Sequence, residues 1–144
     1  MDKNSENWEY GISEELALVS SQKSPVLIGE NEFIYRITGL NWGNIPNTWS
    51  YKEATSVAID SEDNVFVFNR GDIPVIVFNP EGDVIDTWGE GIFSSPHGIT
   101  IDNNDDIFCV DVGDHSVRKF SKNGDLIFEI GTPGIPSEPM SGVP

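Results

Sequence analysis

The sequence predicts an all-β fold built from repeated four-stranded sheets, and two observations carry this prediction. The first is an internal repeat of 42 residues, in which residues 56–89 align without a gap with residues 98–131. The second is the alternation of apolar and polar residues in short runs, which turns rich in Gly, Asp and Asn separate. Helical periodicity is absent from both repeats. One small twisted sheet cannot bury its faces alone, so a period of about 40 residues with four strands per repeat is typical of β-propeller blades.

The chain divides into successive segments from its N-terminus. We expect residues 1–28 to form an irregular arm, because their apolar periodicity is weak. Residues 29–53 contain one alternating strand, "NEFIYRI", and then a loop that leads into the first blade. In closed propellers such an outer strand often pairs with the last blade of the chain, and we expect the same role here.

Residues 54–90 make the first predicted blade, with strands in "SVAID", "VFVFN", "PVIVFN" and "VIDTWG". Residues 91–132 make the second blade on the same plan. The turns "EGD" and "NGD" are hairpin signals, because Gly supplies positive φ while Asp and Asn form local side-chain turns. Residues 133–144 are rich in Gly and Pro and are expected to lead toward a missing blade.

Two blades are too few for a closed ring, since propellers need about four or more. The predicted blades would therefore expose sheet faces that the apolar pattern marks as buried. Two explanations stay open: either the sequence is a fragment of a larger ring, or several copies of the chain assemble to complete one.

Composition limits the classes of partner. The 144 residues include 24 acidic and 8 basic side chains, and the formal net charge of −16 argues against nucleic acid and anionic membrane surfaces as partners. A small-molecule or peptide substrate remains compatible with this charge. We expect a cytoplasmic protein, because no signal peptide or apolar membrane span is recognisable. The single cysteine, Cys109, excludes a disulfide framework and is expected to be a buried, inert thiol.

Several motifs together carry a resemblance to a known family. They are "VAIDSEDNVFVFNRGD", "VIVFNPEGD", "DTWGEG", "SPHGITID" and "GDHSVRKF". From Phe33 to about Pro133 the chain resembles the NHL-repeat propellers, and among them the peptidyl-α-hydroxyglycine α-amidating lyases and their bacterial relatives. The resemblance implies a six-bladed ring, of which this chain supplies the first two blades. It also implies a zinc ion held in the central channel by three histidines, and a structural calcium ion in the same channel.

Four residues match the functional positions of that family. His97, in the Pro-His-Gly turn, matches the first zinc-binding histidine, and Arg70, in "FNRGD", matches the active-site arginine. The backbone carbonyls of Val57 and Ile99 match calcium ligands. Innermost strands line the channel of a propeller, so a histidine at the start of "GITID" is a reasonable metal ligand.

Structural roles remain open for the same side chains. His97 could be a polar residue at a strand entrance, and Arg70 could pair with one of the many acids. Thr55 takes the place of His97 in the first repeat, which fits a ligand on alternate blades. His115 is expected to be a structural residue of its blade. Since the chain contains 2 histidines, one copy cannot supply a three-histidine site.

Three functional hypotheses follow. The first is zinc-assisted cleavage of the N–Cα bond of a C-terminal α-hydroxyglycine, which gives an amide and glyoxylate, with the chain alone incomplete and inactive. The second is a non-catalytic NHL module that binds a protein or a ligand. The third is a remnant without activity. A homotrimer would make six blades and place three copies of His97 around one axis, which is the ligand count that the site needs.

Overall fold

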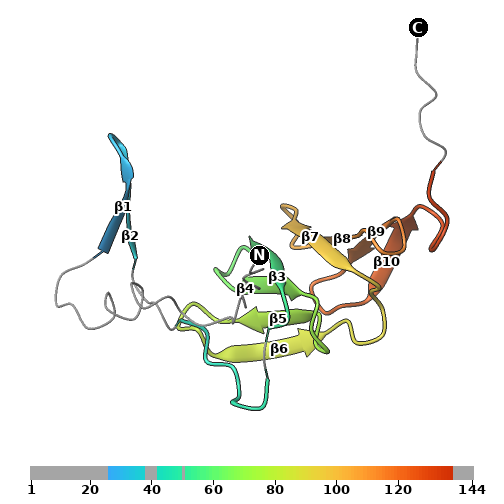
Figure 1. The fold of residues 1–144 in the computed structure, drawn as a ribbon, viewed down its shortest axis with the longest axis horizontal. Helices are drawn as coiled ribbons and strands as arrows, with labels where there is room; N and C mark the ends of the chain where they lie inside the picture. The colour runs from blue at the N-terminus through green and yellow to red at the C-terminus, as the bar shows by residue number, and fades with distance from the viewer. Residues whose placement is uncertain (1–25, 38–41, 50, 138–144) are drawn as a thin grey trace, which may run out of the picture. The chain divides into compact units, whose positions relative to one another are not determined.

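The structure is all-β, as the sequence predicts. The computed structural model describes residues 26–37, 42–49 and 51–137, and within these ranges it contains ten strands and no helix (Figure 1). The strands form one two-stranded sheet and two four-stranded sheets. No helix long and apolar enough to cross a membrane occurs in the described part of the chain. The chain divides into two units, and the boundary in the sequence falls between Trp42 and Gly43.

The first unit contains a hairpin of β1 (Val26–Glu30) and β2 (Phe33–Ile37), paired in antiparallel register. The weak periodicity of the N-terminal segment predicts an irregular arm up to residue 28, but β1 begins at Val26. The reason is pairing: Asn31 adopts a left-handed φ of 53° and turns the chain back, so that the non-alternating run "VLIGE" finds a partner in β2. Residues 1–25 of the arm, 38–41 and 50 of the following loop, and 138–144 of the tail lie outside the described residues.

The second unit begins with a four-stranded antiparallel meander that we call blade 1. Its strands are β3 (Ala54–Ile59), β4 (Val65–Asn69), β5 (Val75–Phe78) and β6 (Val84–Trp88). The Asp60 carboxylate accepts the backbone N–H groups of residues 62 and 64 and so closes the turn between β3 and β4. This turn sits where the polar run "DSEDN" interrupts the alternation.

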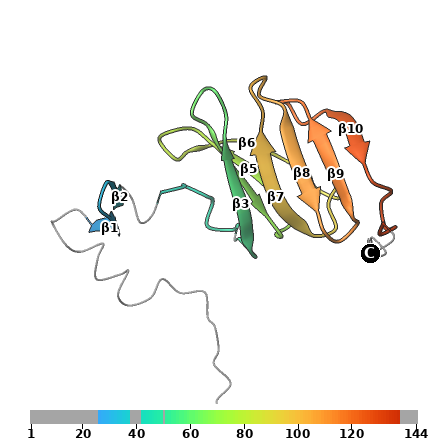
Figure 2. The same cartoon turned by 90° about the horizontal axis from the view of Figure 1, so that it is seen from above.

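Blade 2 repeats the same order with β7 (Pro96–Ile101), β8 (Ile107–Asp111), β9 (Ser116–Phe120) and β10 (Leu126–Ile130). Asp102 closes its first turn as Asp60 does in blade 1, by accepting the N–H groups of residues 104 and 106. Figure 2 shows the innermost strands β3 and β7 next to each other, with β8, β9 and β10 following in order.

The main core lies between the two blades. It contains the following buried residues: Phe66, Phe68, Val75, Val77, Ile99, Ile107, Cys109 and Phe120. Phe93, in the loop between the blades, packs edge-on against Phe68 with 4.8 Å between the ring centroids. Trp88 packs against Phe120 at 5.0 Å. Packing of aromatic and aliphatic side chains therefore joins the blades into one body.

A second, smaller cluster lies on the opposite face of blade 1. Val67, Ile76 and Phe78 are buried there, and Ile45 and Trp49 pack against them from the loop before β3. This loop is also held to the blade by a backbone hydrogen bond of 2.7 Å from Asn44 N to Gly82 O. It covers the outer strands of this face, whereas Val57 and Ile59 on β3 stay exposed.

Candidate functional site

His97 is the extra residue of a β-bulge at the start of β7. Pro96 pairs with Asp111 and Gly98 pairs with Val110, so His97 has no partner in the register of β8. A bulge bends the strand and re-aims one side chain, and the His97 side chain is exposed. Blade 1 has the same register shift at Thr55, which confirms that these two positions correspond in structure as well as in sequence.

Arg70 directly follows β4 and reaches from blade 1 to blade 2. Its Nε donates a hydrogen bond of 3.1 Å to the carbonyl oxygen of Pro96, the residue before His97. Its Nη1 forms an ion pair with Glu53, and its backbone N–H donates to the Glu53 carbonyl at 2.9 Å. The structure thus brings Arg70 and the strand entrance that carries His97 together, although Arg70 and Pro96 are 26 positions apart in the sequence.

Val57 and Ile99 occupy the same register position in their blades, where Val57 pairs with Val67 and Ile99 pairs with Cys109. Since β3 and β7 contact each other, the two residues lie on neighbouring innermost strands. The role of their carbonyl groups as calcium ligands stays a prediction.

The described residues of one chain do not fit the zinc site that the resemblance implies. Over residues 26–37, 42–49 and 51–137, no group of three or more His, Cys, Asp or Glu side chains is arranged to hold a metal ion. His115, the other histidine in these ranges, lies in the turn between β8 and β9 with a φ of 62°. A zinc site with three protein ligands therefore requires further ligands, either from other copies of the chain or from outside these ranges.

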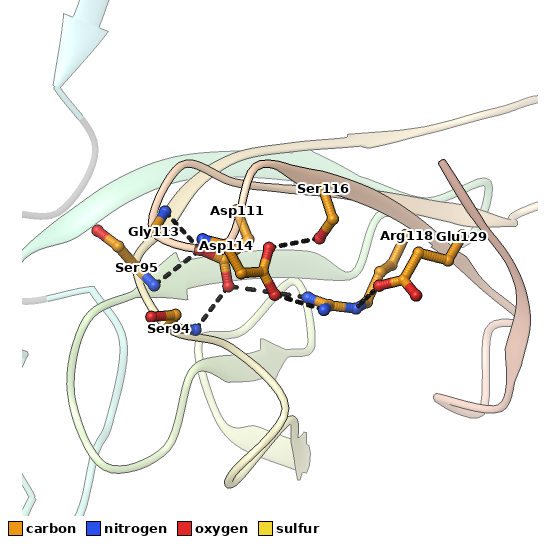
Figure 3. A network of polar contacts seen from close by, with 8 residues as sticks. All are labelled: Ser94, Ser95, Asp111, Gly113, Asp114, Ser116, Arg118 and Glu129. Carbon is orange, nitrogen blue, oxygen red and sulfur yellow. Dashed lines mark hydrogen bonds and ion pairs between the residues drawn. The ribbon is translucent and has the colours of Figure 1, made fainter. Parts of the chain in front are cut away.

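A polar network fixes the loop that leads to His97 (Figure 3). The Asp111 carboxylate accepts the backbone N–H groups of Ser94 at 2.6 Å, Ser95 at 2.8 Å and Gly113 at 2.9 Å. Asp111 is fully buried. Because buried polar oxygens need hydrogen-bond donors, these backbone groups and Asp111 hold one another in place. The loop enters β7 in a fixed path as a result.

Arg118 joins this network from β9 (Figure 3). Its guanidinium pairs with Asp114 and with Glu129, the latter at 2.6 Å, and its Nη1 lies 3.7 Å from Asp111. Burial alone would raise the pKa of Asp114, but hydrogen bonds from Ser116 and Arg118 outweigh burial and lower this pKa below its usual value. Asp114 therefore stays ionised beside Arg118 at neutral pH.

The roles of Asp111, Arg118 and Glu129 are not among the predictions from the sequence. The signal was present in "DVGDHSVRKF", where Asp111, Asp114 and Arg118 stand at short intervals. Blade 1 has isoleucine, Ile76, at the position of Arg118, so comparing the repeats for identities could not reveal the network.

Cys109 is fully buried between the blades, as expected. Burial raises the pKa of its thiol to about 12. A thiol with such a pKa stays protonated at neutral pH, so Cys109 contributes packing rather than nucleophilic chemistry.

Comparison with known proteins identifies the repeat type. The NHL repeat model matches residues 93–120, a segment that contains β7, β8 and β9 together with the loop residue Phe93. A search of curated proteins gives no match to the chain. The chain therefore carries an NHL repeat in a fold whose four-stranded sheets fit the blades of a β-propeller.

Proposed function

We propose that the two blades form part of a lyase propeller, to which this chain contributes His97 and Arg70. The observation that supports the proposal is the hydrogen bond from Arg70 Nε to the carbonyl oxygen of Pro96. It brings the Arg70 guanidinium to the strand entrance of blade 2, where His97 follows Pro96. These residue types suit cleavage of an N-acyl-α-hydroxyglycine, a substrate that carries a carboxylate and a hydroxyl group on one carbon.

Arg70 would bind the carboxylate of this substrate. A guanidinium forms paired hydrogen bonds with a carboxylate, and Glu53 now provides such a carboxylate to Arg70. The substrate would therefore compete with Glu53 for the same cation. His97 alone does not make a zinc site, so the proposal requires further histidines from other blades. Three copies of the chain would provide them, with one His97 on every second blade.

Glyoxylate release tests this proposal. N-benzoyl-α-hydroxyglycine is incubated with the chain over a series of protein and zinc concentrations, and glyoxylate is measured. We expect release only from oligomeric protein, and we expect Arg70→Ala and His97→Ala to abolish it. His115→Ala is the matched control, because it removes the other histidine of the described residues and should leave release unchanged. Failure to release glyoxylate at every concentration would overturn the lyase proposal.

A second candidate is a non-catalytic module that binds a protein surface. The observation that favours it is that Glu53 already neutralises Arg70, while Val57 and Ile59 remain exposed on an open sheet face. For such a module, Arg70→Ala and His97→Ala would leave binding of the protein partner unchanged, and Ile59→Asp would abolish this binding.

A further inference from the structure

Each blade has two sheet faces, and the contact inside the chain uses one face of each. In blade 1 this face carries Phe66, Phe68, Val75 and Val77. Blade 2 contacts blade 1 through the face that corresponds to the other side of blade 1. This face of blade 2 carries Ile99, Ile107, Cys109 and Phe120. Because the blades are repeats, each kind of face also occurs once where neither of the two described blades covers it.

The uncovered face of blade 1 corresponds to the face that blade 2 buries. Val57 is the counterpart of Ile99, and it is 61% exposed whereas Ile99 is 7% exposed. Ile59, the neighbour of Val57 on the same face, is 60% exposed. The difference in exposure shows how much apolar surface a neighbouring blade buries on this kind of face. Val57 and Ile59 therefore form an open apolar strip on β3.

The uncovered face of blade 2 corresponds to the face that blade 1 presents to its neighbour. Phe108, Val110 and Val117 are the counterparts of Phe66, Phe68 and Val75. Lys119 replaces Val77 in this row. Its Nζ is held within its own blade at 2.7 Å from Asp106 and 3.1 Å from Asp102, and it lies 5.0 Å from the centre of the Phe108 ring. The one basic side chain of this row is therefore already paired and lies over an apolar ring.

We propose that a second copy of this chain docks head to tail on these faces. The strip on β3 of one copy would pack against β7 and β8 of the next copy, as β7 packs against β3 and β4 within the chain. Ile45 and Trp49 cover the outer strands of blade 1 and leave this strip open. The existing contact between the blades is thus the template for the contact between copies.

The polar edge of the template can also be repeated. Within the chain, Ser61 donates its backbone N–H at 2.9 Å and its hydroxyl at 2.6 Å to the Asp105 carboxylate. The counterparts are Asn103, a donor in blade 2, and Asp63, an acceptor in blade 1. Asp63 and Asp105 occupy the same turn position, with φ values of 64° and 61°. An Asn103 amide of one copy can therefore donate to Asp63 of the next.

An aromatic side chain is repeated at this contact too. Phe93 precedes β7 and packs against Phe68 of the neighbouring blade, and Tyr51 stands at the same position before β3. Blade 2 has an open hollow of about 510 Å³, lined partly by Val117 and Ile130. Tyr51 of the next copy faces this hollow in the repeated arrangement.

Such contacts join two different faces, so they are heterologous and can close into a ring. Rings of about four to eight blades correspond to two to four copies of this chain. The inference depends on the sheet faces alone, and the lyase proposal can fail without affecting it.

Sedimentation velocity tests the inference with variants that each change one of the two docking faces. We expect the 144-residue chain to form a discrete species of two to four times 15.9 kDa. Thr100 pairs with Phe108 on the uncovered face of blade 2 and is exposed. Ile59→Asp on β3 and Thr100→Asp on β7 should each give monomers with unchanged circular dichroism. A mixture of the two variants should restore a dimer and nothing larger, because each pair then keeps one intact contact. Lys119→Val places the residue type of blade 1 on the uncovered face of blade 2, and in the otherwise wild-type chain it should tighten association.

A matched control separates this contact from others. Ile34→Asp changes the same residue type at 57% exposure in the hairpin of β1 and β2, and it should leave association unchanged. His97→Ala should do the same, whatever happens to glyoxylate release. A monomeric wild-type chain, an oligomer that survives Ile59→Asp, or a mixture that stays monomeric would each overturn the inference.

Discussion

At the scale of single residues, one exchange between the repeats changes what a side chain holds in place. Asn69 and Asp111 end equivalent strands, β4 and β8. The Asn69 amide donates to the carbonyl of Ile73 at 2.8 Å and so closes a turn within its own blade. The Asp111 carboxylate instead accepts from Ser94 and Ser95, in the loop before the next strand. Asp111 has two acceptor oxygens and no side-chain N–H group. Both oxygens accept from the loop before β7, and Asp111 therefore ties the end of β8 to that loop.

Replacing Asp111 by alanine should destabilise the protein by about 2–4 kcal/mol. The change leaves the backbone N–H groups of Ser94, Ser95 and Gly113 without their acceptor. It also removes the carboxylate that lies 3.7 Å from Arg118 Nη1, so that the guanidinium keeps only Asp114 and Glu129. Urea denaturation measures the free energy of unfolding. Asp125→Ala, at an exposed turn, is the control and should change this free energy by no more than about 0.5 kcal/mol. Equal losses in the two variants would contradict the assigned role of Asp111.

The pH dependence of the free energy of unfolding should show the contribution of Asp114 to stability. Its folded-state pKa is lowered, so its contribution is fully present above its unfolded pKa of about 3.9 and is lost as the pH falls through the folded value. Unfolding free energies measured from pH 6 downward should therefore decline less steeply in Asp114→Asn than in the wild type below about pH 4. A curve as steep as that of the wild type would show that Asp114 does not carry this dependence.

At the scale of elements, alternation and turn chemistry predicted the eight strands of the two blades. The bulges at Thr55 and His97 could not be predicted in this way. One extra residue shifts the pairing of two strands but leaves no characteristic residue type in the sequence. The strand β1 was missed since its partner, β2, decides its structure. Of the site, the sequence indicated His97 and Arg70, but the contact of Arg70 with Pro96 crosses between blades and has no local signal.

Close packing of the turn between β8 and β9 against the loop before β7 gives an element-scale prediction. A Cβ on Gly113 would lie 2.8 Å from Ser95 Cβ and 2.9 Å from the Ser95 backbone nitrogen. Gly113→Ala should therefore destabilise the protein by about 1–3 kcal/mol in urea denaturation. Gly98→Ala is the matched control, because its Cβ would meet Val110 at an ordinary 3.6 Å. Equal effects of the two substitutions would contradict a steric cause.

At the scale of the whole molecule, charge and apolar surface oppose each other. The net charge of −16 repels like copies, whereas the open sheet faces favour their association. Within the chain, ion pairs of Lys122 with Asp60 at 3.3 Å and with Glu62 at 3.0 Å reinforce the contact between the blades. Pro80 stands at the position of Lys122 in blade 1, so the contact between copies lacks the counterpart of this lysine.

Association between copies should therefore strengthen as salt is added. Salt screens repulsion between the net charges but does not weaken apolar packing, and the missing lysine removes the ion pairs that salt would disrupt. We expect the dissociation constant from sedimentation equilibrium to fall roughly three- to tenfold between about 0.05 M and about 0.5 M sodium chloride. Restoring the lysine with Pro80→Lys should reduce this gain, because the new pairs to the acidic turn at Asp102 would themselves be screened. A dissociation constant that rises with salt in the wild-type chain would mean that ion pairs, and not the sheet faces, hold the copies together.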